Sequence, residues 1–252
     1  MTDPVFIHPI PIEAAADGSA GFRFALTGAE AKHVDVKRLK DGEPLVITDG
    51  QSRAVRAVWR GGQVEVTEGL AVPAPRPTVT VVQAIPKSER AELAVDLMVQ
   101  AGADRIIPWE SARTIAKWAG KENKARLKWE NAARSAAKQA RRLRVPEVTM
   151  PVRSVAQIAE LLDDAPTASR QILVLHESAS VSVKSCDFTT CDEVVLVVGP
   201  EGGVAPEEID QLESLGARTV VLGPEVLRTA SAAAVALGAI GALSPRWAAT
   251  TD

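Results

Sequence analysis

The first seventy residues alternate apolar and polar positions in short runs, which is the pattern of half-buried β-strands. Asp49-Gly50 and Gly61-Gly62 separate these runs as turn signals. A short helix is predicted over 29–38. The predicted strands cover 5–8, 22–26, 44–48, 54–59 and 63–67. This part of the chain therefore predicts a small β-barrel.

Three prolines within residues 71–77 form a stiff linker, and we expect a domain boundary there, between 1–72 and 73–252. Beyond it, short apolar runs alternate with stretches of helical period. The predicted strands are 78–84, 104–108, 171–176, 193–198 and 219–222, and the predicted helices are 88–101, 122–142, 155–162, 207–214 and 229–243. Such alternation predicts an α/β domain with a mostly parallel sheet that is covered on both faces.

The composition is that of an ordinary globular protein, with 46% hydrophobic residues in 252. No run of 18 apolar residues predicts a membrane-spanning helix, and the N-terminus carries no export signal, so we expect a cytoplasmic protein. The two cysteines, Cys186 and Cys191, are too few for a four-ligand zinc site. No metal cofactor is predicted.

Charge is unevenly distributed along the chain. The net charge is −3, but residues 73–153 carry 16 Lys/Arg against 8 Asp/Glu. Within 117–144 there are ten Lys/Arg and two acids, and four of these cations are spaced to lie on one helical side: Arg134, Lys138, Arg141 and Arg142. The segment indicates a local surface for a polyanion such as RNA, although a solvated charged helix remains an equal alternative. Trp118 and Trp129 are expected in the core rather than stacked on bases.

Two strands end in glycine turns. Val194–Val198 runs into Gly199-Pro-Glu-Gly-Gly203, and Val220–Leu222 runs into Gly223-Pro-Glu225. Neither turn is a P-loop or a dinucleotide fingerprint. Glycines at the carboxyl ends of parallel strands let the backbone approach a ligand, so two adjacent turns predict one shared pocket. Tight strand–helix turns without a ligand are the alternative.

These turns, with Val226-Leu-Arg-Thr-Ala230 after the second, resemble the cofactor region of SPOUT methyltransferases. More narrowly, the chain resembles the ribosomal RNA small-subunit methyltransferase E family, which methylates uridine N3. The likeness extends to Lys32-His33-Val34, to Gln139–Arg142, and to Lys87, Arg113 and Trp129. Ala230-Ser231 stands where the family commonly has Glu-Thr.

The resemblance implies a C-terminal SPOUT sheet with a deep trefoil knot, a PUA-like N-terminal barrel and a homodimer packed through the knot region. The small residues of 229–243 suit such close packing, although an Ala-rich core helix has the same composition. The implied activity is transfer of a methyl group from S-adenosyl-L-methionine to uridine N3 in 16S ribosomal RNA of the small subunit.

The resemblance also assigns site residues. Arg228 is expected to orient the uracil and stabilise negative charge on its oxygens, although it could equally brace the turn. Cofactor binding is assigned to Leu175, His176, Gly199, Pro200, Glu201, Gly202, Gly203, Leu222, Gly223, Leu227, Arg228 and Thr229. RNA binding is assigned to His33, Lys37, Arg38, Lys87, Arg113, Arg134, Gln139, Arg141 and Arg142.

Three other functions fit the sequence. A SPOUT enzyme could act on a different RNA, or a non-catalytic RNA-binding ribosome-assembly factor could retain the fold. An enzyme with a nucleotide-like small substrate could use the same pocket, but the basic middle segment does not favour it.

Overall fold

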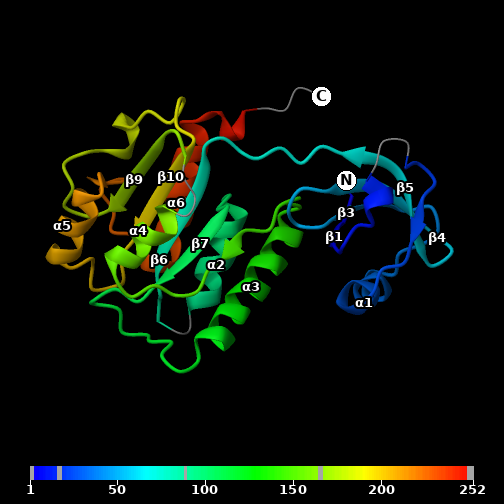
Figure 1. Ribbon diagram of the computed structural model, residues 1–252, viewed down its shortest axis with the longest axis horizontal. Helices are drawn as coiled ribbons and strands as arrows, with labels where there is room; N and C mark the ends of the chain where they lie inside the picture. Colours follow the sequence, from blue (N-terminus) through cyan, green and yellow to red (C-terminus); the bar gives the residue numbers. More distant parts are fainter. Residues whose placement is uncertain (1–2, 16–18, 88–89, 164–166, 249–252) are drawn as a thin grey trace. The chain divides into compact units, whose positions relative to one another are not determined.

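The computed structural model describes residues 3–15, 19–87, 90–163 and 167–248. The chain divides into two compact units (Figure 1). The first contains the chain up to Pro73 together with Ala137–Val145, and the second contains Ala74–Ala136 and the chain from Pro146 onward. The sequence pattern places 137–145 after the linker, whereas hydrogen bonds hold it in the first unit: Thr48 Oγ1 donates to the Leu143 carbonyl at 2.6 Å, and the Val145 N–H to the Gly50 carbonyl at 2.8 Å.

The first unit contains a five-stranded sheet in the order β1-β3-β4-β5-β2. All pairs are antiparallel except β1 with β3. Buried Phe6, Leu45, Ile47, Val55 and Val64 belong to its core. All five predicted strands and the helix are confirmed: β1 (Val5–Ile7), β2 (Arg23–Phe24), α1 (Gly28–Lys37), β3 (Pro44–Thr48), β4 (Ala54–Arg60) and β5 (Gln63–Leu70), with a 3-10 turn η1 (Ile12–Ala15).

The second unit has the predicted α/β architecture. Its six strands are parallel and follow the order β11-β9-β10-β6-β7-β8. The five predicted strands are present, and β8 is a two-residue strand too short for its pattern to predict. Their bounds are β6 (Thr78–Ala84), β7 (Arg105–Trp109), β8 (Glu147–Val148), β9 (Arg170–Leu175), β10 (Glu193–Val198) and β11 (Arg218–Val220).

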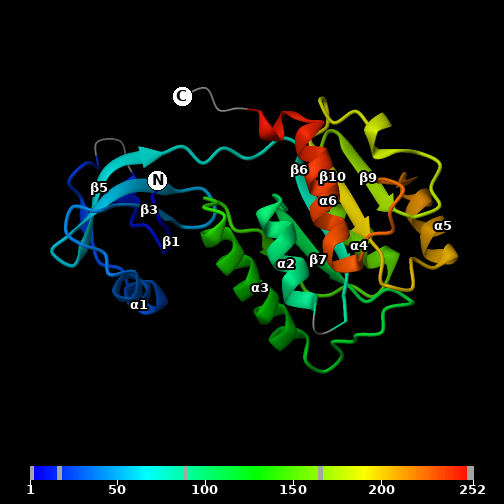
Figure 2. The ribbon, with the colours of Figure 1, turned by 180° about the vertical axis from the view of Figure 1, so that it is seen from behind.

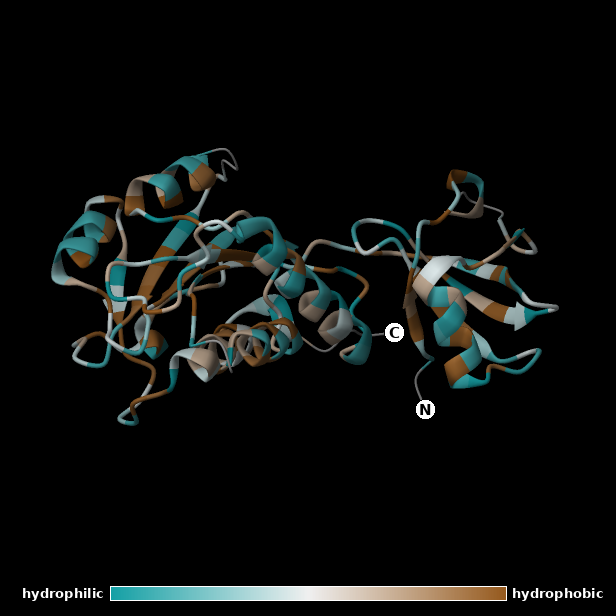
Figure 3. Cartoon of the chain, turned by 90° about the horizontal axis from the view of Figure 1, so that it is seen from below, coloured by the Kyte–Doolittle hydropathy of each residue, from teal (hydrophilic) through white to brown (hydrophobic). Residues whose placement is uncertain are grey.

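Helices cover both faces of this sheet. Helices α2 (Ala91–Gln100) and α6 (Thr229–Ala242) pack together on one face, with α3 (Glu122–Gln139) beside α2, and α4 (Val155–Asp163) and α5 (Pro206–Ser214) lie on the other (Figures 1 and 2). The strands are largely apolar and the helices carry many polar positions (Figure 3). Short 3-10 turns are η3 (Val183–Ser185) and η4 (Pro245–Trp247). None of the helices in the described part of the chain is long and apolar enough to cross a membrane.

Helix α3 ends earlier than predicted. Arg141 adopts a left-handed conformation with φ 56°, and the Arg142 N–H donates to the Ala137 carbonyl at 2.9 Å. This capping geometry ends the helix and turns the chain away. The prediction that Arg134, Lys138, Arg141 and Arg142 share one helical side is therefore wrong, because the last two lie beyond the helix.

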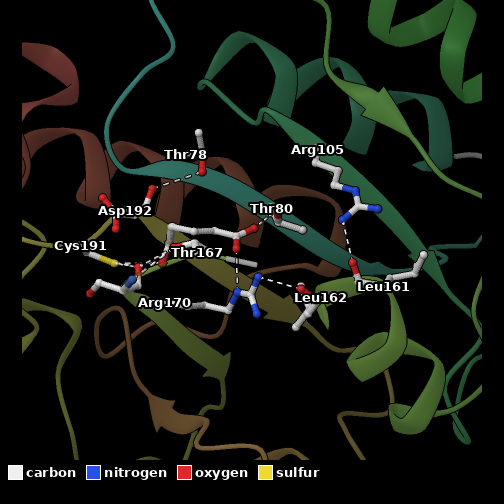
Figure 4. Close-up of polar contacts among 11 residues, drawn as sticks. Thr78, Thr80, Arg105, Leu161, Leu162, Thr167, Arg170, Cys191 and Asp192 are labelled. Carbon is white, nitrogen blue, oxygen red and sulfur yellow. Dashed lines mark hydrogen bonds and ion pairs between the residues drawn. The ribbon is translucent and has the colours of Figure 1, made fainter. Parts of the chain in front are cut away.

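A buried polar network joins the amino ends of three strands (Figure 4). The Glu193 carboxylate accepts hydrogen bonds from Thr80 Oγ1 and Arg170 Nε, each at 2.7 Å. Arg170 also donates to the Leu162 carbonyl at 2.9 Å, which ties the end of α4 to the sheet. A buried carboxylate is stable only when it is paired in this way. The network fixes one edge of the sheet and leaves the opposite edge for the loops that follow the strands.

Candidate functional site

The loops at the carboxyl edge of β9, β10 and β11 enclose a cavity of about 530 Å³, which we call the donor pocket. The glycine turns follow β10 and β11, and β9 lies between these two strands. The expectation that the two turns follow neighbouring strands is therefore wrong. The chain places β9 between them, so Leu175 and His176 at its end form the middle of the pocket wall.

All twelve residues assigned to the cofactor from the sequence line the donor pocket. Arg113, assigned to RNA binding, also lines it, and its Nη1 donates to the Gly202 carbonyl at 3.1 Å. The structure therefore brings the predicted cofactor residues together and adds two cations to them, Arg90 and Arg113. Among the described residues, no three His, Cys, Asp or Glu side chains are grouped to hold a metal ion.

The turn after β10 requires glycine for steric reasons. A Cβ on Gly199 would lie 2.8 Å from Val204 Cγ2 and 3.1 Å from the Val204 nitrogen. Gly203 has φ +72°, a left-handed conformation that favours glycine. The turn therefore folds tightly on itself beside the pocket.

Arg228 lies at the end of the second turn and is the N-cap residue of α6. Its carbonyl accepts the N–H groups of Ser231 and Ala232 at 2.9 and 3.0 Å. Its guanidinium is exposed, and no group in the described part of the chain binds it. The backbone of Arg228 thus braces the helix, while the side chain is left for a ligand.

His176 takes part in the local structure of the turn after β9. Its N–H donates to the Val220 carbonyl at 3.0 Å, and its Nδ1 lies 3.0 Å from Ser178 Oγ. These contacts support a positioning role for the ring within the pocket wall.

A second cavity, of about 850 Å³, lies at the carboxyl ends of β6 and β7. We call it the lysine groove, because seven Lys/Arg and two Glu line it. Arg90, Glu201 and Arg228 line both cavities, so the two adjoin. Other residues that line the groove include Ile85, Lys87, Lys117, Trp118, Lys121, Lys124, Lys128 and Trp129.

Of the groove cations, only Lys87 and Arg228 were singled out from the sequence. Lys121, Lys124 and Lys128 were missed individually, although their spacing of three and four places them on one helical side. Trp118 and Trp129 are buried, as expected, and meet edge to face with ring centroids 5.1 Å apart.

The wall of the groove formed by residues 111–121 is held by a buried carboxylate. Glu110 accepts the Trp118 N–H at 2.8 Å and pairs with Arg153, which also binds Glu122 at 2.7 Å. Hydrogen bonds from its own backbone N–H and from Arg153 hold the pKa of the Glu122 carboxyl below its ordinary value. The charges of Glu110, Glu122 and Arg153 thus serve to fix this loop.

In the first unit, the predicted RNA-binding residues have different surroundings. Lys138 Nζ lies 2.8 Å from Glu30 Oε2 and 2.7 Å from His33 Nδ1. Burial and the charge of Lys138 lower the pKa of His33. The charge of Glu30 and its hydrogen bond to His33 raise this pKa and offset part of the lowering. The remaining assigned residues are exposed except for half-buried Arg142: Lys37, Arg38, Gln139 and Arg141 here, and Lys87, Arg113 and Arg134 in the second unit.

Comparison with known proteins identifies the family. A model described as an RNA methyltransferase domain matches residues 73–241. Ribosomal RNA small subunit methyltransferase E of Mycobacterium bovis is 44% identical over 245 residues, which cover 95% of this chain and 90% of the relative. The chain belongs to the ribosomal RNA small subunit methyltransferase E family.

Other matching proteins share less of the sequence. The ribosomal RNA small subunit methyltransferase E of Bacillus subtilis is 27% identical, with 86% of this chain and 89% of the relative covered. A putative methyltransferase of Legionella pneumophila, solved with the bound cofactor SAM, has a TM-score of 0.79 at 27% identity, covering 97% of this chain and 99% of that one. The family enzyme of Neisseria gonorrhoeae has a TM-score of 0.81 at 24% identity, covering 96% and 98%, and shares the fold.

Proposed function

We propose that this protein transfers the methyl group of S-adenosyl-L-methionine to N3 of a uridine in small-subunit ribosomal RNA. The observation that carries the proposal is the donor pocket, in which the predicted cofactor residues meet beside the free guanidinium of Arg228. Membership of the ribosomal RNA small subunit methyltransferase E family supports both substrates.

The donor pocket fits the cofactor. Its volume of about 530 Å³ lies within the usual range for small-molecule sites. The turns at Gly199–Gly203 and Leu222–Gly223 offer backbone N–H and carbonyl groups, which suit the polar adenosine and amino-acid ends. S-adenosylmethionine supplies a methyl group on a positively charged sulfonium.

Arg228 acts on the acceptor. Because N3 lies on the pairing edge of uracil, the target base must be unpaired and turned into the site. The guanidinium stands where the two cavities adjoin, so it donates to the uracil oxygens as the N3 proton passes to solvent and negative charge spreads over the ring. N3 takes the methyl group as the methyl–sulfur bond breaks, which leaves neutral S-adenosylhomocysteine. Alignment of the base with the donor supplies most of the remaining rate enhancement.

We propose that residues 73–252 form the SPOUT methyltransferase domain with a C-terminal trefoil knot, and that 1–72 form a PUA-like, RNA-binding barrel. Support for the knot comes from Val221, whose backbone bonds to Val181 and Val183 in the connection before β10. An experimental backbone trace without a crossing at this point would contradict the knot. In the first unit, the residues that contact RNA are His33, Lys37 and Arg38 of the barrel and Gln139, Arg141 and Arg142 of the 137–145 segment.

The functional form is a homodimer. Exposed apolar side chains at Val235 of α6, at Leu243 directly after it and at Trp247 support this assembly. Sedimentation equilibrium at micromolar concentration is expected to give twice the chain mass of 26.7 kDa. A monomer throughout that range would contradict it.

Deletion of the gene tests the activity directly. An N3 methyl group blocks base pairing, so reverse transcriptase stops at the modified uridine of wild-type small-subunit RNA. The deletion strain is expected to lose that stop and to regain it with a plasmid copy. If the stop persists in the deletion strain, the proposed reaction is wrong; calorimetry with S-adenosylmethionine tests the donor site separately.

A further inference from the structure

The crevice between β6 and β10 is the point at which the sheet changes direction. These strands are neighbours, but β6 leads into α2 on one face and β10 leads to α5 on the other (Figures 1 and 2). Their loops therefore diverge, which is the arrangement in which open α/β sheets bind ligands. The Lys87 N–H lies 3.4 Å from Glu201 Oε1 across this crevice. The donor pocket lies on the β10 side and the lysine groove on the β6 side.

Six cations of the groove have no side-chain partner among the described residues: Lys87, Arg90, Lys121, Lys124, Lys128 and Arg228. Other cations of the same unit are paired with carboxylates, such as Arg126 with Glu130 and Arg153 with two glutamates. Unpaired cations that converge on one concave surface repel each other, and a bound polyanion relieves that repulsion. The unpaired positive charge of the groove therefore favours an anionic ligand.

The spacing of the lysines suits an extended anion. Lys121 directly precedes α3, and Lys124 and Lys128 lie within it. Continued at the helical rise of about 1.5 Å per residue, these three positions span about 10 Å. The lining of the groove also has apolar residues: Ile115 is exposed, and Ile85 and the two tryptophans are largely buried behind it. This apolar surface can accept sugars and bases. A row of cations beside an apolar surface fits single-stranded nucleic acid better than a compact anion.

We propose that the lysine groove binds the RNA strand that flanks the target uridine, with its phosphates on Lys121, Lys124 and Lys128. The strand then passes Glu201 and Arg228, where the flipped base enters the donor pocket. This assignment rests on the proposed function and defines the path of the substrate. In this assignment the main RNA contact lies at the beginning of α3, whereas the sequence alone placed it at the end of that helix.

The test compares two double variants of equal charge in the full-length protein. Lys124→Gln/Lys128→Gln removes two groove cations. Lys184→Gln/Arg218→Gln removes two exposed cations that line neither cavity. Affinity for small ribosomal subunits from the deletion strain is measured between about 50 and 200 mM salt, and S-adenosylmethionine binding is measured by calorimetry.

The groove variant is expected to bind subunits about 10- to 100-fold more weakly, and its slope of log affinity against log salt is expected to flatten by about 1.4, or about 0.7 per phosphate contact. Its S-adenosylmethionine affinity stays at the wild-type value, and the control variant changes neither. Equal losses in both variants, or an unchanged slope in the groove variant, overturn the assignment. If the wild-type protein does not bind S-adenosylmethionine or does not methylate the subunits, the proposed function is wrong instead. Failure of the groove assignment and failure of the proposed function are therefore distinguishable.

Discussion

The basic middle segment contains two kinds of cation. Those of the lysine groove, such as Lys124 and Lys128, have no partner in the described structure. Lys138 near the end of the same helix contacts Glu30, His33 and the ring of Phe6 within the first unit. In the sequence alone, these side chains are equivalent positive charges of one basic segment. Their surroundings differ: some are unpaired and available to bind a ligand, and others are paired within the protein and stabilise the fold.

Arg228→Ala removes an unpaired cation and has the largest expected effect of these predictions. Removing a donor to developing negative charge lowers kcat by about 10²- to 10³-fold. The melting temperature stays unchanged, because the side chain binds nothing in the described structure. Single-turnover methylation of small subunits measures the effect, and Arg228→Lys is the control that retains charge without the planar fork. A large fall in melting temperature with little change in kcat would place Arg228 among the structural cations.

Lys138→Met tests a cation that is paired within the fold. It removes the ammonium that lies 2.8 Å from the Glu30 carboxylate, which is only 7% exposed. Breaking a buried pair in this way costs about 3 kcal/mol of unfolding free energy. Urea denaturation measures it. The double variant Glu30→Gln/Lys138→Met is expected to recover much of the loss, and no recovery would show that the pair is not the cause.

Gly199→Ala concerns the tight turn at the edge of the donor pocket. The added methyl group collides with Val204, so the turn must shift, and overpacking of this kind costs about 1–3 kcal/mol. S-adenosylmethionine affinity is expected to fall about 10- to 100-fold by calorimetry. Gly69→Ala is the matched control, because a Cβ there meets no atom within 4 Å. Wild-type affinity in Gly199→Ala would contradict the role of this turn.

Arg141→Gly separates side-chain function from backbone strain. The left-handed conformation of Arg141 costs a non-glycine residue about 1 kcal/mol, so glycine is expected to stabilise the protein by about 0.5–1 kcal/mol. The same change removes one proposed phosphate contact and flattens the salt slope by about 0.7. Arg141→Lys keeps the charge and the strain. If glycine neither stabilises the protein nor weakens RNA binding, both assignments are wrong.

His33 predicts a pH dependence. Its pKa in the folded protein lies below the ordinary value of 6.5, because of burial and the nearby Lys138 charge. The unfolded chain therefore takes up the proton first as pH falls through 6.5, and stability decreases until the folded-state pKa is reached. Urea unfolding between pH 7.5 and 5 measures this slope. His33→Gln should lose this component, and an identical slope in the variant would exclude His33 as its source.

The sequence alone determined the elements and the chemistry of the turns. Strands β3, β6 and β10 begin and end at the predicted residues, because strand and helix periodicity are local properties. The turns at Gly199 and Gly223 could likewise be recognised, since small residues after a strand have a local backbone reason.

Only the tertiary structure decided what these elements meet. Whether β9 lies between β10 and β11 depends on crossovers that no local pattern encodes. The placement of 137–145 in the first unit and the pairing of Lys138 with Glu30 depend on contacts with residues nearly a hundred positions or more away. A charge in the sequence has a sign but no partner, and the partner determines whether that charge stabilises the fold or remains free to bind a ligand.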